Sequence, residues 1–422
     1  MAHGGGKVPA KILEAARGMA WMLWPALAPE DTLIIPAPPP AGFLDYLTEQ
    51  GLTPPHFCTE AEVQAKVQTK IQGKVDAAEG ALDLQKIPDV TDALFTPFGW
   101  NEDAARLNAD RNLPASHPDP EIVRRVNSRA FGLELERRLF PESACPATLC
   151  LTRMALAEWL THAPPGRYLA KGNYGHAGIG QLRFELPDAD LSLQKKLRRL
   201  LERHAGLVME ERQEIEQEWG VLFRVGAVPG PLQLRVHRLL SDSSGGYAGA
   251  LVLSKGQMDT AWQIHKASIT DAVQKISQSL RDIGYFGPVG IDVYTHRSAD
   301  GVTHLRNLVD LNARLTMAWP VHGLARRFPD RAILLRHFST SALRAKRAEP
   351  ESQLMNDKLS WPQRLDGLSE GISEGVAIWL TPQLPLTRHA MVLFGESESD
   401  VLRKDDTLRK RLNDFKNWDA CL

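Results

Sequence analysis

Apolar positions along the chain fall into three regimes. From about residue 18 to 125, short apolar runs such as "TLIIPAPPP" and "DALFTPFGW" alternate with helical patterns such as "GFLDYLTEQG". This is typical of an α/β domain whose strands end in turn residues. The regime from about 126 to 340 carries most of the candidate chemistry. Beyond it lie a basic stretch with a helical pattern, "LARRFPDRAILLRHFSTSALRAKRAEP", and two strand-like runs, "EGVAIWLTP" and "HAMVLFG".

These regimes predict a multidomain protein of mixed α/β and α+β class. We expect an N-terminal α/β domain over 1–125 and a central domain over 126–340, divided into 126–210 and 211–340. A small C-terminal α+β extension would follow over 341–422. The chain, 422 residues long, is large enough for each part to bury a core of its own.

The first candidate functional segment of the central domain is glycine-rich and covers residues 166–184, "GRYLAKGNYGHAGIGQLRF". A short strand delivers Lys171 into a loop that holds Gly175, Gly178 and Gly180, and the strand "QLRF" follows. Glycines let backbone amides approach an anion, and a lysine at the loop's edge adds a point charge for phosphate. The pattern matches neither a Walker loop nor a dinucleotide fingerprint. An ordinary hairpin with a solvated lysine is the alternative.

Farther along the chain, acidic residues end one apolar strand and begin the next. "GLVMEERQEIEQEWGVLFRV" places Glu210 and Glu211 at the end of one strand and Glu218 at the head of the next. Such acceptors suit an adenine amino group and ribose hydroxyls, although a charged hairpin tip explains the segment by itself.

The segment "GPVGIDVYTHRSADGVTHLRNLVDLNARLTM" predicts a hairpin with strands 289–295 and 304–310. Asp292 interrupts the first strand, and Asp310 with Asn312 ends the second. Residues two apart share a face, so Arg314 can project with them. Neighbouring carboxylates repel each other unless a cation intervenes, and an oxygen-only set favours Mg²⁺. An Asp/Asn turn with a surface ion pair to Arg314 is the alternative.

As an ordered set, these segments resemble the ATP-grasp superfamily of carboxylate ligases across roughly 126–320. Residues before them resemble the Rossmann-like domain that usually precedes an ATP-grasp fold, through "TPFGWNEDAARLNADRNLP" and "VNSRAFGLELERRLFP". The resemblance implies a lid subdomain with a glycine-rich flap over 126–210 and a magnesium-binding catalytic subdomain over 211–340.

The resemblance also implies roles for individual residues. Nucleotide would be bound by Arg129, Lys171, Gly175, Gly178, Gly180, Glu210, Glu211 and Glu218. Mg²⁺, with Mn²⁺ as an alternative, would be held by Asp292, Asp310 and Asn312. Arg314, Arg235 and Lys171 are the implied catalytic residues. Arginine stands at 129 and aspartate at 310 where the family more often has lysine and glutamate, and the resemblance does not decide between Glu210 and Glu211 as the hinge beside adenine.

The strand "LQLRVHRLL" places Arg235 and His237 on one face and Arg238 on the other. Either set is a candidate to hold an acyl phosphate or to deprotonate an amine, although a histidine in such a place is more often a packed residue.

The activity implied by the resemblance is ADP-forming activation of a carboxylate as an acyl phosphate, followed by coupling to an amine. The expected partners are therefore a small-molecule carboxylate and an amine, with no membrane. The alternatives are an ATP-grasp kinase, a nucleotide-binding module without turnover, and a nucleic-acid binder using the basic residues 323–347. The formal net charge of -1, from 50 basic and 51 acidic side chains, speaks against nucleic acid.

Cysteine usage and the N-terminus bear on the compartment. The four cysteines lack paired metal-site spacing and disulfide density. The run "GMAWMLWPALA" after Lys7, Lys11 and Arg17 imitates a signal peptide, but it contains Pro25 and leads into another strand-like stretch. A cytoplasmic protein is expected. A homo-oligomer is possible, and the sequence decides neither the oligomeric state nor the substrates.

Overall fold

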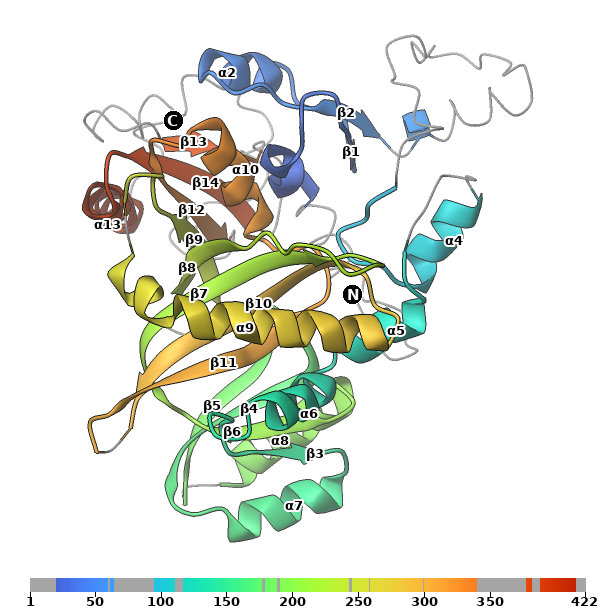
Figure 1. Cartoon of the computed structure of the whole chain (residues 1–422), viewed down its shortest axis with the longest axis vertical. Helices are drawn as coiled ribbons and strands as arrows, with labels where there is room; N and C mark the ends of the chain where they lie inside the picture. Colours follow the sequence, from blue (N-terminus) through green and yellow to red (C-terminus); the bar gives the residue numbers. More distant parts are fainter. Residues whose placement is uncertain are drawn as a thin grey trace.

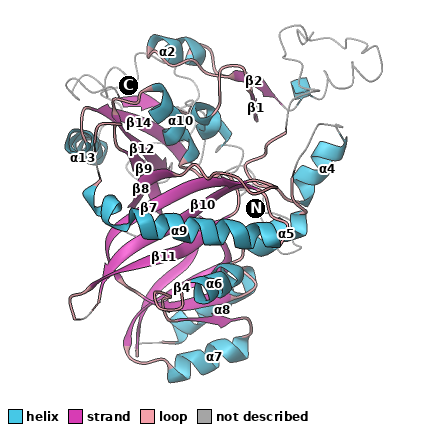
Figure 2. Ribbon diagram, in the orientation of Figure 1, coloured by secondary structure: helices cyan, strands magenta, loops and turns pink. Residues whose placement is uncertain are grey.

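A computed structural model of the chain describes residues 20–59, 61–63, 95–110, 117–176, 179–187, 190–242, 245–257, 259–298, 300–339, 377–381 and 388–414. Within these ranges no helix has the length and apolarity needed to cross a membrane. Figure 1 shows the course of the chain and Figure 2 its helices and strands.

A large antiparallel sheet forms the middle of the molecule (Figure 2). It has eight strands in the order β11-β10-β7-β8-β9-β12-β14-β13. The strands are β7 (Glu214–Val225), β8 (Arg235–Ser241), β9 (Tyr247–Val252), β10 (Gly287–Arg297), β11 (Thr303–Asn312), β12 (Ala332–Ser339), β13 (Ala377–Trp379) and β14 (Arg388–Gly395). The predicted hairpin of 289–295 and 304–310 is confirmed as β10 and β11, and the predicted C-terminal strands as β13 and β14.

Helix α9 (Thr260–Asp282) covers one face of this sheet across β7, β10 and β11 (Figure 1). Asp259 caps its start, because its carboxylate accepts a hydrogen bond from the Trp262 amide at 3.0 Å. Ile269, Val273 and Ile276 recur at helical spacing and are fully buried against the sheet. Each such side chain contributes about 2 kcal/mol through burial, so this face of the sheet is a firm platform.

A smaller sheet lies below the large one in Figure 1. Its four antiparallel strands have the order β3-β6-β4-β5. They are β3 (Ala147–Cys150), β4 (Gly166–His176), β5 (Ile179–Leu186) and β6 (Leu207–Glu211), packed against α7 (Arg153–His162) and α8 (Leu191–Arg203). The glycine-rich segment is the β4–β5 hairpin, and its strands are longer than predicted.

Helices α4 (Glu102–Asp110), α5 (Pro120–Val126) and α6 (Arg129–Leu139) come shortly before the smaller sheet in the chain. Ser128 caps α6 by accepting a hydrogen bond from the Phe131 amide at 3.2 Å. Because α6 contacts β11 of the large sheet and β4 of the small one, it lies where the two sheets meet.

The N-terminal and C-terminal parts share one hydrophobic core with the far end of the large sheet. The N-terminal elements are the 3-10 helix η1 (Trp21–Ala26), β1 (Thr32–Ile35), α2 (Phe43–Glu49) and β2 (His56–Thr59), with β1 and β2 paired in parallel. They pack with α10 (Trp319–Arg327) and with the strands that lie beside α13 (Glu398–Asp414). A Cβ on Gly323 of α10 would lie 1.8 Å from the Pro25 carbonyl oxygen, so the close approach of η1 requires glycine there.

One prediction was wrong in this region. The basic stretch after residue 323 was expected to continue as helix, but α10 ends at Arg327 and Ala332–Ser339 is strand β12. The part of this stretch from residue 340 on lies outside the described residues. Leu334 and Leu335 are both fully buried, on opposite faces of β12. A strand buried on both faces has a continuous apolar run, which periodicity alone does not distinguish from a buried helix.

Candidate active site

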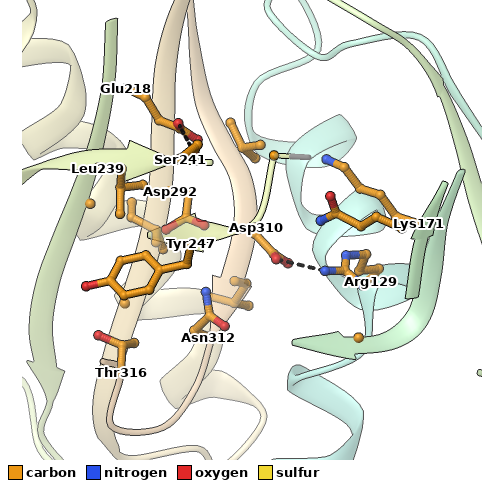
Figure 3. A pocket seen from close by; sticks show the side chains of 18 of the residues that line it. Arg129, Lys171, Glu218, Leu239, Ser241, Tyr247, Asp292, Asp310, Asn312 and Thr316 are labelled. Atoms are coloured by element: carbon orange, nitrogen blue, oxygen red, sulfur yellow. Dashed lines mark hydrogen bonds and ion pairs between the residues drawn. The ribbon is translucent and has the colours of Figure 1, made fainter. Parts of the chain in front are cut away.

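A cavity of about 560 Å³ lies between the two sheets, and its lining comes from both. Figure 3 shows its interior. From the small sheet come residues of the β4–β5 hairpin and the end of β6, and from the large sheet come residues of β7, β8, β10 and β11. The predicted residues in this lining are Arg129, Lys171, Gly175, Glu210, Glu211, Glu218, Asp292, Asp310, Asn312 and Arg314.

Strand register explains why the predicted metal ligands meet. Asp292 of β10 is paired directly with Asp310 of β11, and Gly290 is paired with Asn312. Directly opposed residues in an antiparallel pair have side chains on the same face, with Cβ atoms about 5 Å apart. The prediction that Asp292 lies alongside Asp310 is therefore confirmed.

The acidic group on the cavity floor is poorly compensated. Burial and the carboxylates of Asp310 and Glu218 raise the pKa of Asp292 well above its ordinary value. The pKa of Glu218 is also raised, chiefly by burial, although the hydroxyl of Ser241 donates a hydrogen bond to it at 3.2 Å. Asp292 makes no hydrogen bond or ion pair with any described side chain. The acidic group consists of Glu218, Asp292 and Asp310, and Figure 3 shows these three residues in the cavity.

Two arginines approach this acidic group from its ends. Arg129 Nη2 lies 3.1 Å from Asp310 Oδ2, and its other terminal nitrogen donates to the Gly172 carbonyl oxygen. Arg314 Nη2 donates to Asn312 Oδ1 at 2.7 Å. The predicted phosphate cation at 129 is thus bonded to a predicted metal ligand, while Arg314 makes no ion pair with a described carboxylate.

A second charged group, at the lid side of the cavity, is fully paired. Lys171 contacts Glu210 Oε1 in a close ion pair, and Arg306 Nη1 lies 3.2 Å from Glu210 Oε2. Arg306 also bonds Glu136 through two nitrogens at 2.7 and 2.9 Å, and donates to the Tyr294 hydroxyl at 3.1 Å. Burial alone would raise the pKa of Glu210, but Lys171 and Arg306 hold it below its ordinary value.

This network distinguishes the two candidate hinge acids. The side chain of Glu210 is buried and committed to Lys171 and Arg306. Glu211 points to the other face of β6, is exposed, and lines the cavity. Glu211 is therefore the acid of the two whose carboxylate is available to a ligand.

The glycine hairpin is only partly described. Gly175 lines the cavity, Gly178 lies outside the described residues, and Gly180 is absent from the lining. Gly180 has φ +85°, and a Cβ there would lie 2.7 Å from the ring of His204. His204 Nδ1 donates to the Tyr174 carbonyl oxygen at 2.8 Å, and this bond holds the hairpin in position. This role of His204 was not predicted.

The structure does not bring Arg235 into the cavity lining. Its guanidinium lies over the Trp319 ring, 5.0 Å from the centroid, and its catalytic role stays a prediction. His237, two residues on, does line the cavity, and its Nδ1 is 3.1 Å from His322 Nε2. Burial lowers the pKa of His237 to about 3, so this pair is uncharged at neutral pH. Arg238, on the other face, is held away from the cavity by ion pairs with Asp259 and Glu398.

Several lining residues were missed by the sequence reasoning, namely Phe98, Trp100, Tyr174, Gln181, Arg183, Ser241 and Tyr247. Thr316 and Met317 also line the cavity, and they belong to the segment "LTM" at which a substrate loop was expected to begin. Gln181 is paired with Lys171 across the hairpin, and Arg183 lies two residues farther along β5. Ser241 lies four residues beyond His237 on β8. Strand alternation from a recognised neighbour was the available signal for these. Phe98 and Trp100 lie on a loop, where no periodicity marks them.

The donor set suits a magnesium ion, which the resemblance to ATP-grasp proteins implies. Two opposed carboxylates and an amide oxygen are hard oxygen ligands. Asp292 makes no ion pair with a described residue, and its raised pKa shows that its charge is costly unless a cation binds. Within the described ranges, no three His, Cys, Asp or Glu side chains form a metal-holding group. The protein would thus supply few ligands, and nucleotide phosphates and water the rest, as is usual for Mg²⁺.

Comparison with known proteins supports the fold. No protein-family profile matches the chain, and no curated protein sequence matches it. The N5-carboxyaminoimidazole synthetase of Staphylococcus aureus, solved with ADP, is similar in structure, with TM-score 0.53 and 10% identity over 97% of this chain and 95% of that one. The N5-carboxyaminoimidazole ribonucleotide synthetase of Thermus thermophilus has TM-score 0.51 and 12% identity over 94% of this chain and 96% of that one. Both are ATP-grasp proteins, and the predicted fold is thereby confirmed.

Proposed function

From the ATP-grasp fold of this chain, we propose that it is an ATP-dependent, ADP-forming ligase that joins a carboxylate to an amine. The observation that carries the proposal is Asp292, which makes no ion pair with a described residue and lies directly opposite Asp310 in a cavity that also holds Lys171 and Arg314. An acid pair in a cavity beside separate cations suits a magnesium nucleotide, whose metal and phosphates carry the opposite charges.

The proposed metal ligands are Asp292, Asp310 and Asn312. When bound, Mg²⁺ supplies positive charge that neutralises phosphate oxygens. The proposed lid is the β4–β5 hairpin with its glycines, and the proposed catalytic subdomain begins after β6, close to the boundary at residue 211 expected from the sequence.

The chemistry proceeds in two steps. A carboxylate oxygen of the substrate attacks the γ-phosphorus of ATP, and the bond from that phosphorus to the bridging oxygen breaks, which yields an acyl phosphate and ADP. Arg314 and Lys171 stabilise the negative charge that spreads over the transferred group. An amine nitrogen then attacks the acyl carbon, phosphate leaves, and the nitrogen loses a proton to form the amide.

Water must be excluded between the two steps, because an acyl phosphate hydrolyses readily. The β4–β5 hairpin is suited to this task, since its residues Tyr174, Gly175 and Gln181 line the cavity opposite the acidic floor. Opening of the ion pair between Lys171 and Glu210 would let the lysine turn toward phosphate, while Arg306 remains as the partner of Glu210.

A nucleotide-binding module without turnover is the second candidate. The ion pair between Arg129 and Asp310 favours it, because it engages a phosphate-binding cation with a metal ligand. Arginine also does not replace lysine simply at a phosphate site. In the ligase, nucleotide binding must separate Arg129 from Asp310.

An ADP-release assay with hydroxylamine as trap tests the proposal. The protein is incubated with Mg-ATP and a pool of amino and hydroxy acids, beside Asp310→Ala and the surface control Asp300→Ala. ADP and a hydroxamate that disappear only in Asp310→Ala support the ligase. ADP with a phosphorylated alcohol and no hydroxamate indicates a kinase. Binding of Mg-ATP without ADP release across the pool favours the module.

A further inference from the structure

The sheet face that forms the cavity floor changes charge along its strands. Asp292 of β10, which Figure 3 shows in the cavity, is paired with Gly220 of β7. Two residues farther along β7, Leu222 is paired with Arg235 of β8. Directly paired residues and residues two apart on a strand share a face, so Arg235 lies on the face that carries Asp292. The acidic end of this face is therefore followed by a basic one.

A second arginine lies on the same face. Arg224 is two residues beyond Leu222 on β7, which makes it the diagonal neighbour of Arg235. Diagonal neighbours are about 7–8 Å apart, which is within reach of long side chains. Arg224 is exposed and Arg235 is half-buried, so a solute can reach both.

Helix α10 adds a third arginine. The guanidinium of Arg235 lies 5.0 Å from the centroid of the Trp319 ring, and this contact orients it. Trp319 is the first residue of α10, and Arg326 lies in the last turn of the same helix and is exposed. Arg326 and Arg224 both lower the pKa of Arg235, so both charges act on it. We call Arg224, Arg235 and Arg326 the arginine cluster.

The arginine cluster has no counter-charge among the described residues. None of its three members makes an ion pair there, and the Arg326 guanidinium makes only a 3.4 Å contact with the Ala26 carbonyl oxygen. No carboxylate opposes the lowering of the Arg235 pKa. By contrast, Arg238 on the other face of β8 has two carboxylate partners. Like charges gathered without a counter-charge repel each other, and an anion that binds between them relieves the repulsion.

We propose that the arginine cluster binds a phosphate monoester group carried by one of the two organic substrates. A guanidinium can donate two parallel hydrogen bonds to a phosphate, and several cations together suit its double charge. This assignment rests on the proposed ligase function, because that function places the reacting end of the substrate near the metal ligands.

The distance between the arginine cluster and the metal ligands fits one small substrate. Arg235 and Asp292 are one side-chain step, about 7 Å, apart along the strands and two strands, about 10 Å, apart across the sheet. Their Cα atoms are therefore separated by about 12 Å, and the two side chains shorten this gap. A molecule the size of a sugar phosphate can span it.

A binding experiment without turnover tests the assignment. The protein is saturated with Mg²⁺ and a non-hydrolysable ATP analogue, which fills the positions of the nucleotide's own phosphates. Methyl phosphate is then compared by calorimetric titration with methyl sulfate, which has the same shape and one charge less, and with acetate. We expect methyl phosphate to bind most tightly and to weaken as salt is added. Absence of methyl phosphate binding, or equal binding of acetate, would overturn the assignment.

Variants place the bound phosphate. Arg224→Gln and Arg235→Gln should each weaken methyl phosphate binding about 10-fold, in line with the loss of one charged hydrogen-bond partner. The matched control is Arg198→Gln, at an exposed position of α8, which should bind methyl phosphate as the natural protein does. Equal weakening in Arg198→Gln would mean a general attraction of anions, and the site would be withdrawn.

The outcome is distinguishable from that of the ligase proposal. Methyl phosphate binding that depends on Arg224 and Arg235 supports the phosphate site even if no mixture of acids yields ADP, in which case the ligase fails alone. ADP release with no such binding leaves the ligase standing and removes the phosphate site. Arg224→Gln should also leave the affinity for the ATP analogue unchanged. A matching loss of that affinity would assign the arginine cluster to the nucleotide and overturn the proposal.

Discussion

Two charged groups face the same cavity from neighbouring elements, but only one of them is electrically complete. Glu136, Arg306, Glu210 and Lys171 form a chain in which each carboxylate has a cation and each cation a carboxylate. Asp292 and Glu218, in the same sheet as Arg306, have raised pKa values and no ion pair with a described cation. The first group has the completeness of a structural element, whereas the second lacks a charge that a ligand can supply.

The difference follows from what each group joins. The paired group links α6, β6 and β4 to β11 and β10, so it holds the small sheet against the large one. Asp292 and Glu218 lie within one sheet, and their side chains bond no described element outside it. Repulsion between them and Asp310 is tolerated because the antiparallel ladder, with Asp292 paired to both Asp310 and Gly220, fixes the strands by backbone bonds.

The largest effect is expected from Arg306→Ala. Its guanidinium is 3% exposed and bonds two buried carboxylates, and both would lose a partner. Breaking a buried pair in this way costs about 3–5 kcal/mol of unfolding free energy, measured by urea denaturation. Arg297→Ala, which removes an exposed ion pair to Glu216, is the control and should change the unfolding free energy far less, because solvent screens an exposed pair. Equal losses in the two variants would erase the distinction between the groups.

Asp292→Asn should have the opposite profile. Removal of one carboxylate relieves repulsion, so the free energy of unfolding without ligand should stay unchanged or rise. Loss of a metal and phosphate contact should lower ADP release by about 100–1000-fold. Asp300→Asn, in an exposed turn, is the control. If Asp292→Asn instead lowers the melting temperature and keeps its turnover, the acidic group is structural and the comparison fails.

A third prediction concerns His237, on the same cavity floor as the acidic group. Its folded pKa is lowered to about 3 by burial, while an unfolded histidine titrates near about 6.5. Between these values the unfolded state binds a proton that the folded state does not, so stability is present above about pH 6.5 and falls by about 1.4 kcal/mol per pH unit below it. His322, whose pKa is lowered by burial and by His237, Arg235 and Arg326, adds to the slope.

His237→Gln should therefore reduce the loss of unfolding free energy between pH 6 and pH 5, measured by urea denaturation at each pH. His162→Gln, on an exposed helix position, is the matched control and should keep the slope of the natural protein. An unchanged slope in His237→Gln would mean that the buried histidine pair does not govern acid sensitivity.

The sequence predicted which site residues close to one another in the chain come together, but not which residues far apart in the chain do so. Asp310, Asn312 and Arg314 alternate within one strand end, and Asp292 is on the neighbouring strand of a hairpin, so period and spacing sufficed. Arg306 and Glu136 are 170 positions apart in the sequence, and no sequence pattern around either residue predicts that they form an ion pair. Arg235 was expected in the cavity because it shares a strand face with His237, but it lies at the strand's first position and stacks on Trp319. Loop residues such as Trp100 depend on how separate segments meet, which only tertiary structure decides.

The smallest effect is expected from Glu211→Gln, which compares an exposed acid with its buried neighbour Glu210 in the paired group. Glu211 is exposed and has no ion pair with a described residue, so its change should alter unfolding free energy by less than about 0.5 kcal/mol. If its carboxylate meets a nucleotide, Mg-ATP affinity should fall about 5-fold, the value of one hydrogen bond. Glu210→Gln should reverse this order, since it removes the charge between Lys171 and Arg306 and costs stability first. Calorimetric titration and urea denaturation of both variants measure the two quantities. A larger loss of affinity in Glu210→Gln at unchanged stability would place the buried acid at the nucleotide, and Glu210 would then belong to the site together with Lys171.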